Sequence, residues 1–215
     1  MHSLHSRLLL TASLVLAGFL GATGLALDKA FRVSAEAAMQ ERLQSHIYAL
    51  LAAADEDAIG RMLPPQQLPE PRFSKPDSGL YAVITSDSGD PLWHSASLTG
   101  RNFDVAEQQL PGERRFSRLA HAGMQLYTLA FGVAWEDYAG TESLYTYTVA
   151  EDTSVFEAEV NSFRSTLWRW LGGMALVLLI AQGLILRWGL RPLRRVSTDV
   201  QQSEQGHAER LEGDY

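Results

Sequence analysis

The sequence contains no cysteine. Disulfide bridges, cysteine-ligated zinc sites and thiol nucleophiles are therefore excluded. It also lacks a glycine-rich phosphate loop and a nucleophile-base pair of recognisable spacing, so no catalytic chemistry is indicated. With 215 residues, the chain has room for one ordinary domain plus membrane segments, or for two small domains.

Basic residues are scarce in the middle of the chain. Between positions 28 and 166 there are 20 acidic and 11 basic residues, a net charge of −9, whereas the whole chain carries −7. The remaining residues are therefore net positive. An acidic middle section suits cations or cationic partners and argues against nucleic acid as a partner.

Two uncharged stretches hold most of the aliphatic side chains. Residues 8–27 form a run of twenty residues, which as a helix of about 30 Å matches the core of a bilayer. A cleaved signal peptide is the alternative, because small residues of the kind found at cleavage sites end this run. The second predicted span, 167–187, has Gln182 as the one polar residue of its apolar core and tryptophans at both ends. A buried core helix is the alternative there.

Basic residues beside the spans predict their orientation. Four arginines lie together at the end of the second span: Arg187, Arg191, Arg194 and Arg195. The largest basic cluster is expected in the cytoplasm. Residues 1–7 are then a cytoplasmic tail, 28–166 an extracytoplasmic domain, and 188–215 a second cytoplasmic segment.

The periodicity of residues 28–166 predicts a helix followed by strands. Apolar residues at three- and four-residue steps predict a helix from Asp28 to about Gly60 that continues the first span. The proline-rich residues 64–79 predict a surface loop. Short runs bounded by turn residues predict about five antiparallel strands, at 80–86, 91–95, 115–121, 124–135 and 143–150, the last of which alternates apolar and polar residues.

A second helix is expected to start near Thr153 and to run into the second span. Ser154 and Glu157 stand in capping-box spacing at its start. The first helix can cover one face of the sheet and so bury its apolar side. The predicted fold class is α+β, of PAS-like kind, with a central antiparallel sheet between two transmembrane helices.

The residues after the second span carry the most specific motif. Trp188, Leu190, Arg191, Pro192 and Leu193 match the Trp-x-Leu-Arg-Pro-Ile/Leu pattern where a HAMP linker begins in sensor histidine kinases. The whole chain resembles the input half of PhoQ-like sensor histidine kinases: cytoplasmic tail, span, PAS-like periplasmic domain, span and HAMP. On this resemblance, 188–215 are the incomplete start of that linker, and the chain is a fragment that ends before its output domain.

This resemblance implies a homodimeric, multi-pass protein of the bacterial inner membrane, with a sensor domain of the type found in PhoQ, DcuS and CitA. It implies signal relay to a protein-histidine kinase domain that uses ATP and phosphorylates a cytoplasmic response regulator. No catalytic residue and no cofactor are expected in this chain itself. Two alternatives stay open. One is the same input joined to a chemotaxis transducer or a cyclic-dinucleotide enzyme. The other is a stand-alone periplasmic binding module.

Glu136, Asp137 and Glu142 are the candidate metal-binding residues. PhoQ-like sensors carry a dense acidic run near the membrane face that binds divalent cations or cationic peptides, and this thinner cluster is the nearest equivalent. The strand before the second helix is expected to run back along that helix, which would place residues 136–142 near the membrane. Mg²⁺ or Ca²⁺ would then bridge these carboxylates and anionic lipid. The alternative is a solvated hairpin loop.

Gln182 and Pro192 are the candidate signal-relay residues. Gln182 should face the helix bundle because lipid cannot satisfy its amide, and it either fixes one rotational state or holds the helices together. Pro192 begins the expected linker helix. His46, His94 and His121 are candidates for a response to acid, because histidine is the side chain that usually changes its charge near neutral pH, but no pattern places them together.

Four other acidic residues are interpreted as structural. Asp87 and Asp90 flank an expected turn and are better explained as turn residues than as metal ligands. Glu151 and Asp152 lead into the second helix, where negative charge stabilises the N-terminus.

Overall fold

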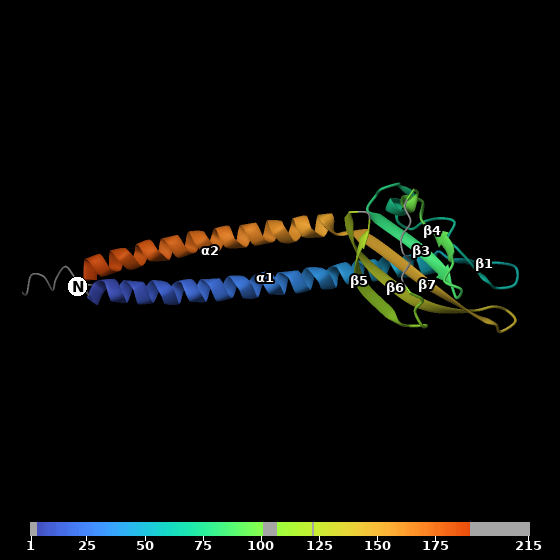
Figure 1. Cartoon of the computed structure of the whole chain (residues 1–215), viewed down its shortest axis with the longest axis horizontal. Coiled ribbons are helices and arrows are strands. Elements are labelled where there is room, and N and C mark those ends of the chain that lie inside the picture. The colour runs from blue at the N-terminus through green and yellow to red at the C-terminus, as the bar shows by residue number, and fades with distance from the viewer. Residues whose placement is uncertain (1–3, 101–106, 122, 190–215) are drawn as a thin grey trace, which may run out of the picture. The chain divides into compact units, whose positions relative to one another are not determined.

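The computed structural model describes residues 4–100, 107–121 and 123–189 (Figure 1). The chain divides into two compact units. Residues 30–162 form the first, called here the sheet unit. The described residues of the second, called the helix unit, are 4–29 and 163–189.

The first helix, α1, spans Leu4–Ala52 and supplies residues to both units. It ends before the expected Gly60, so that prediction is wrong. The Asp57 carboxylate accepts hydrogen bonds from the backbone N–H groups of Ile59 and Arg61 at 3.0 and 2.9 Å, and such local bonding competes with a helix. A small hairpin of β1 (Asp55–Glu56) and β2 (Met62–Leu63) follows instead.

A five-stranded antiparallel sheet forms the centre of the sheet unit, in the order β4-β3-β7-β6-β5. Its strands are β3 (Leu80–Ser86), β4 (Pro91–His94), β5 (Arg114–His121), β6 (Met124–Glu136) and β7 (Glu142–Asp152). The five predicted strands are all present, with ends within two residues of the prediction. The mixed helix and sheet class is therefore confirmed, while the PAS-like type stays a prediction.

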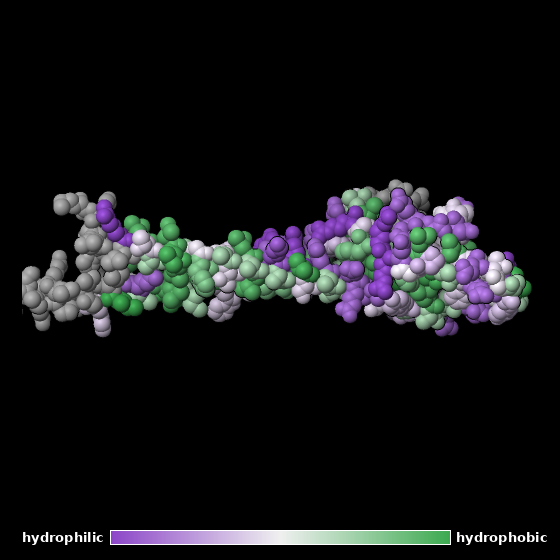
Figure 2. Space-filling model, turned by 90° about the horizontal axis from the view of Figure 1, so that it is seen from below, coloured by the Kyte–Doolittle hydropathy of each residue, from purple (hydrophilic) through white to green (hydrophobic). Residues whose placement is uncertain are grey.

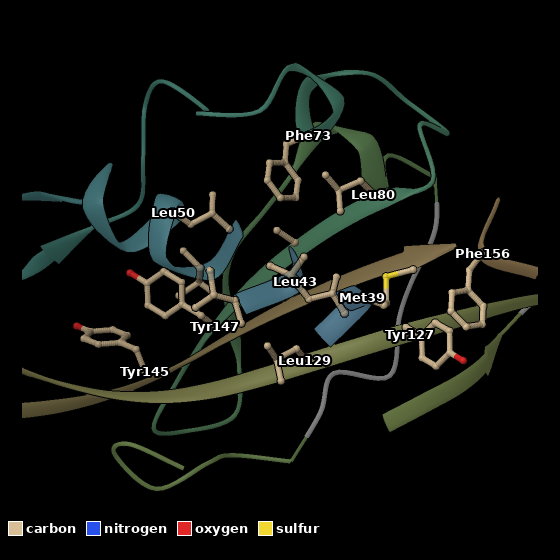
Figure 3. Close-up of a cluster of buried hydrophobic side chains, with 14 of the residues drawn as sticks. Met39, Leu43, Leu50, Phe73, Leu80, Tyr127, Leu129, Tyr145, Tyr147 and Phe156 are labelled. Carbon is tan, nitrogen blue, oxygen red and sulfur yellow. The ribbon is translucent and has the colours of Figure 1, made fainter. Parts of the chain in front are cut away.

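One face of the sheet packs against α1 and forms the main core (Figure 3). The helix contributes Met39, Leu43, Ile47 and Leu50, at the three- and four-residue steps of one helix face. The strands contribute residues at two-residue steps: Leu80, Ala82, Ile84, Leu129, Tyr147 and Val149. Phe73 of the short helix η1 (Pro71–Ser74) is also fully buried in this core.

The other face of the sheet carries a second, smaller cluster. Leu98 of the short helix η2 (Ala96–Leu98) packs there with Tyr81, Val83, Leu126 and Ala150. Residues 107–112 also approach this face, where the backbone N–H of Gln109 donates to Thr146 Oγ1 at 3.0 Å. The chain passes so close to Gly132 that a side chain there would meet the carbonyl oxygens of Gln109 and Leu110.

The second helix, α2, spans Thr153–Gly189 and follows β7 directly. The Asp152 carboxylate caps it, because Oδ1 accepts a hydrogen bond from the backbone N–H of Ser154 at 2.7 Å. The cap is thus Asp152 rather than the expected Ser154. Phe156 and Val160 of the first turns are buried in the main core.

The helix unit consists of the apolar parts of α1 and α2. By length and composition, both helices are able to cross a membrane. Their apolar side chains are exposed, as the green surface in Figure 2 shows, with Leu14 at 75% and Ile185 at 70%. A core helix of a soluble domain would bury such residues. This exposure supports the two predicted spans and argues against the buried-helix alternative.

Candidate functional site

The predicted cation-sensing residues lie at the connection between β6 and β7. Glu136 and Glu142 face each other as the last cross-strand pair of these strands. Asp137 holds the turn, because its Oδ1 accepts hydrogen bonds from the backbone N–H groups of Ala139 and Thr141 at 2.9 and 2.8 Å. Like charges on facing strand positions repel each other, and a divalent cation between the two glutamates would remove that repulsion.

This turn packs against the β1–β2 hairpin. The backbone N–H of Tyr138 donates to the carbonyl oxygen of Ile59 at 3.1 Å, and Trp135 Nε1 donates to that of Gly60 at 3.1 Å. The Tyr138 hydroxyl donates to Glu56 Oε2 at 3.0 Å. Two turns that are far apart in sequence thereby form one surface.

The β6–β7 turn lies at the end of β7 opposite to the start of α2 (Figure 1). The position of this turn relative to the membrane stays a prediction. β7 ends at Asp152, and α2 begins at the next residue, Thr153.

Metal binding by these carboxylates stays a prediction. Among the residues that the structure describes, no three acidic, histidine or cysteine side chains gather as metal ligands. Glu136 and Glu142 would supply two carboxylates on an exposed surface. A hard cation there would complete its shell of oxygen ligands with water or backbone carbonyl groups.

Of the three histidines, His46 has the most distinctive surroundings. It lies on α1 with its ring edge-on to Phe73, at 5.7 Å between centroids. Burial lowers the pKa of His46 below its usual 6.5, although the nearby carboxylates of Glu151 and Glu70 oppose this effect. His94 lies exposed on β4, and the side chain of His121 is outside the described residues.

An ion-pair network joins the buried carboxylate of Glu151 in β7 to two partly exposed arginines. Glu151 Oε2 accepts a hydrogen bond from Arg42 Nε of α1 at 3.0 Å, and Oε1 accepts one from Arg72 NH1 of η1 at 2.9 Å. Arg72 NH2 also donates to the carbonyl oxygen of Ser78 at 3.4 Å. One carboxylate thus connects three elements of the sheet unit.

Sequence reasoning missed this network. The interpretation of Glu151 as a helix-start residue is wrong, and only its neighbour Asp152 serves as a cap. A signal was present, because Glu151 continues the two-residue steps of Tyr147 and Val149, which face the core. A carboxylate at a position patterned for burial requires a cationic partner. The sequence does not say which arginine provides it.

Two further polar contacts join α1 to β5. Arg118 NH2 donates to Glu36 Oε1 at 2.5 Å and also to the Tyr127 hydroxyl. The Arg118 guanidinium lies 4.6 Å from the centroid of the Tyr127 ring. Arg114 NH1 donates to Gln44 Oε1 at 2.9 Å. Polar contacts therefore attach α1 to the sheet in addition to the apolar core.

In the helix unit, α1 and α2 are joined near Gly24. A Cβ atom at Gly24 would lie 2.8 Å from Leu171 Cδ1, so the glycine permits a close approach. The Gln182 amide oxygen is buried and has no hydrogen-bond partner among the described residues. Its predicted role in signal relay stays a prediction. Pro192 lies outside the described residues.

The chain thus has a folded α+β unit between two helices that are long and apolar enough to cross a membrane. The chain is similar to the two-component sensor PhoQ of Pseudomonas aeruginosa, with 30% identity over 213 residues. The similarity covers 99% of this chain and 47% of the relative, so the chain spans about half the length of the protein it matches. No protein-family model and no solved structure matches the chain. The predicted resemblance to a PhoQ-like sensor is confirmed.

Proposed function

We propose that this chain is the sensory and transmembrane input region of a two-component sensor histidine kinase. The similarity to a two-component sensor along 99% of the chain carries the proposal. The folded unit between two apolar helices supports it. Residues 28–166 are the PAS-like sensor domain, and 188–215 begin a HAMP linker. The protein-histidine kinase activity, with its ATP site and phosphoacceptor histidine, belongs to a domain that follows this linker.

The receptor lies in the bacterial inner membrane with both termini in the cytoplasm. The arginine cluster at residues 187–195 supports this orientation. It acts as a homodimer, in which the apolar helices of two copies pack together. Signal binding outside shifts the balance between two packings of these helices. The kinase domain then changes its phosphotransfer to a response regulator in the cytoplasm.

Gln182 is proposed to distinguish these two packings. Its amide oxygen is buried and has no donor among the described residues, and an unsatisfied amide is costly in a membrane. A packing in which a second copy supplies the donor is therefore favoured over one in which it does not. Replacing Gln182 with leucine is expected to shift the basal output.

A chimeric receptor tests the proposed function. Residues 1–215 are joined to the remaining half of the Pseudomonas relative and expressed in cells that lack a sensor of this type. Transcription from a promoter under control of the response regulator is expected to change when the extracellular Mg²⁺ concentration or pH changes. The matched control carries the same kinase half without residues 30–162. A sensory role would be contradicted if transcription were the same with both proteins and did not change with the Mg²⁺ concentration or pH.

The orientation has its own test. Reporter fusions after Gly79 and after Gly206 are expected to show activity in opposite compartments. Activity of both in the same compartment would contradict the two-span topology.

A further inference from the structure

We propose that Glu151 is the positioning residue that couples α1 to the start of α2. This inference rests on the proposed function, because such coupling has a purpose only if the two helices relay a signal. It concerns how a change within the sheet unit reaches the first turn of α2.

The position of Glu151 on the chain makes this coupling direct. Only Asp152 separates it from Thr153, the first residue of α2. The Glu151 carboxylate is held by Arg42 of α1 and Arg72 of η1, at 3.0 and 2.9 Å. The start of α2 is therefore connected to α1 through one side chain, over a sequence separation of 109 residues.

A backbone contact fixes the same point. The backbone N–H of Asp152 donates to the carbonyl oxygen of Gly79 at 2.8 Å. The Asp152 side chain in turn caps the helix through Ser154. These bonds hold residues 151 and 152 to the sheet. A shift of α1 therefore acts at this point by making or breaking the Arg42–Glu151 ion pair, two positions before α2 begins.

The exposed fractions of the three charged side chains show which of them can leave the ion-pair network. The Glu151 side chain is 6% exposed, whereas those of Arg42 and Arg72 are 51% and 39% exposed. A buried carboxylate without a partner is strongly unfavourable, but an arginine that leaves can be solvated. Glu151 is therefore the fixed centre and the arginines are the exchangeable partners. A shift of α1 that withdraws Arg42 leaves Glu151 to Arg72 alone, and this gives two discrete states.

The Glu36–Arg118 ion pair provides a matched control. It also joins α1 to the sheet, at 2.5 Å, but its arginine lies on the edge strand β5 and not beside the start of α2. The pair between Glu107 and Arg115 is a second control, because it lies on the surface and does not involve α1. Substitutions at these pairs alter stability or surface charge without touching the proposed connection.

Disulfide crosslinking in the full chain tests the coupling. The chain has no cysteine, so a pair introduced by Gly24→Cys and Leu171→Cys supplies its only thiols. These positions are neighbours, because a Cβ at Gly24 would lie 2.8 Å from Leu171 Cδ1, an atom that Leu171→Cys removes. The rate of oxidation in membranes then reports how α1 and α2 are packed in the helix unit.

We expect Glu151→Gln and Arg42→Gln to lower this rate by about threefold or more, a size typical of energetic coupling between distant sites. Glu36→Gln and Glu107→Gln are expected to leave it unchanged. Arg42→Lys is expected to restore most of the rate, because it keeps the charge. If Glu36→Gln lowers the rate as much as Glu151→Gln does, the effect is general destabilisation, and the proposal is overturned.

The same variants in the chimeric receptor separate this inference from the proposed function. Regulated output that Glu151→Gln leaves unchanged would refute the coupling and keep the sensory role. Constant output from the unmodified chimera would refute the sensory role, and the crosslinking rate alone would then decide the coupling. A thermal melt checks the fold of each variant. If Glu151→Gln does not fold, Glu151→Asp replaces it, with the same expected direction and the same refuting result.

Discussion

Asp28 of α1 and Arg164 of α2 form a two-bond ion pair, with Nε 3.0 Å from Oδ1 and NH2 3.1 Å from Oδ2. Paired contacts of this kind fix orientation as well as distance. The residues lie just outside the predicted spans, at 8–27 and 167–187. The ion pair therefore sets the register of α1 against α2 where the two helices leave the apolar region.

Removal of one partner is expected to loosen this register. Asp28→Asn and Arg164→Gln should each slow disulfide formation between cysteines at positions 24 and 171. The exchange of both charges, in an Asp28→Arg and Arg164→Asp double variant, should restore at least half of the lost rate. Lys29→Gln is the control, because Lys29 is an exposed charge on the same turn. A double variant as slow as the slower single variant would show that the two charges do not act as a pair.

Gly60 should be sensitive to substitution because two constraints act on it. Its φ of +87° favours glycine, and an added Cβ would lie 2.6 Å from Tyr138 Cδ1. Gly89 is the matched control, with φ +81° and no atom within 4 Å of such a Cβ. We expect Gly89→Ala to cost about 1 kcal/mol and Gly60→Ala about 3 kcal/mol. Chemical denaturation of the chain in detergent micelles measures both, and equal losses would show that the Tyr138 contact is unimportant.

Tyr147 carries a hydroxyl group that should be dispensable. Its side chain is fully buried against α1, its hydroxyl has no hydrogen-bond partner among the described residues, and burial raises its pKa to about 12. Because a buried unpaired hydroxyl is costly, Tyr147→Phe should stabilise the fold by about 1 kcal/mol. Tyr127→Phe should instead destabilise it by a similar amount, since that hydroxyl bonds to Arg118. The same sign for both variants in denaturation experiments would contradict this assignment.

His46 should make the stability of the fold depend on pH. Burial lowers its pKa below 6.5 in the folded state. The unfolded chain therefore binds the proton more readily. The contribution of His46 is complete above pH 6.5 and is lost as pH falls through the folded pKa. The melting temperature should fall with acidification in this window, and the fall should be smaller in His46→Gln. Exposed His94→Gln is the control, and an equal slope in all three proteins would exclude His46 as the cause.

The strands could be predicted because their signal is local. Residues 80–86 form an apolar run of the length of a strand, on a sheet whose two faces are both buried, and β3 has the predicted ends. The end of α1 could not be predicted from apolar spacing, since the bonds from Asp57 to the backbone of Ile59 and Arg61 override it. The ends of an element can thus be predicted where the pattern of apolar residues decides them. They are harder to predict where a polar side chain bonds to the backbone and ends a helix early.

The candidate site was harder to predict because it depends on contacts between distant segments. Arg42 and Glu151 are separated by 109 positions, and no local pattern pairs them. The place of the β6–β7 turn likewise depends on the direction in which β7 enters α2. The sequence identifies the carboxylates of this turn but not the groups that surround them. Only the three-dimensional arrangement shows that Asp137 bonds to its own turn while Glu136 faces Glu142.

Cation binding at the β6–β7 turn can be tested by measuring the stability of the fold without and with metal. Without metal, the Glu136→Gln and Glu142→Gln double variant should be more stable than the unmodified chain, because two facing like charges are removed. With millimolar Mg²⁺ or Ca²⁺, the difference in stability between the two proteins should shrink or change sign, because only the unmodified chain binds the metal at this turn. A ligand at ten times its dissociation constant stabilises the folded form by about 1.4 kcal/mol. The matched control is the double variant Asp87→Asn and Asp90→Asn at the β3–β4 turn, which should keep the full response to metal. A response that is the same in both double variants would place the metal elsewhere, and no response in any protein would leave Glu136 and Glu142 as a strained, solvated pair.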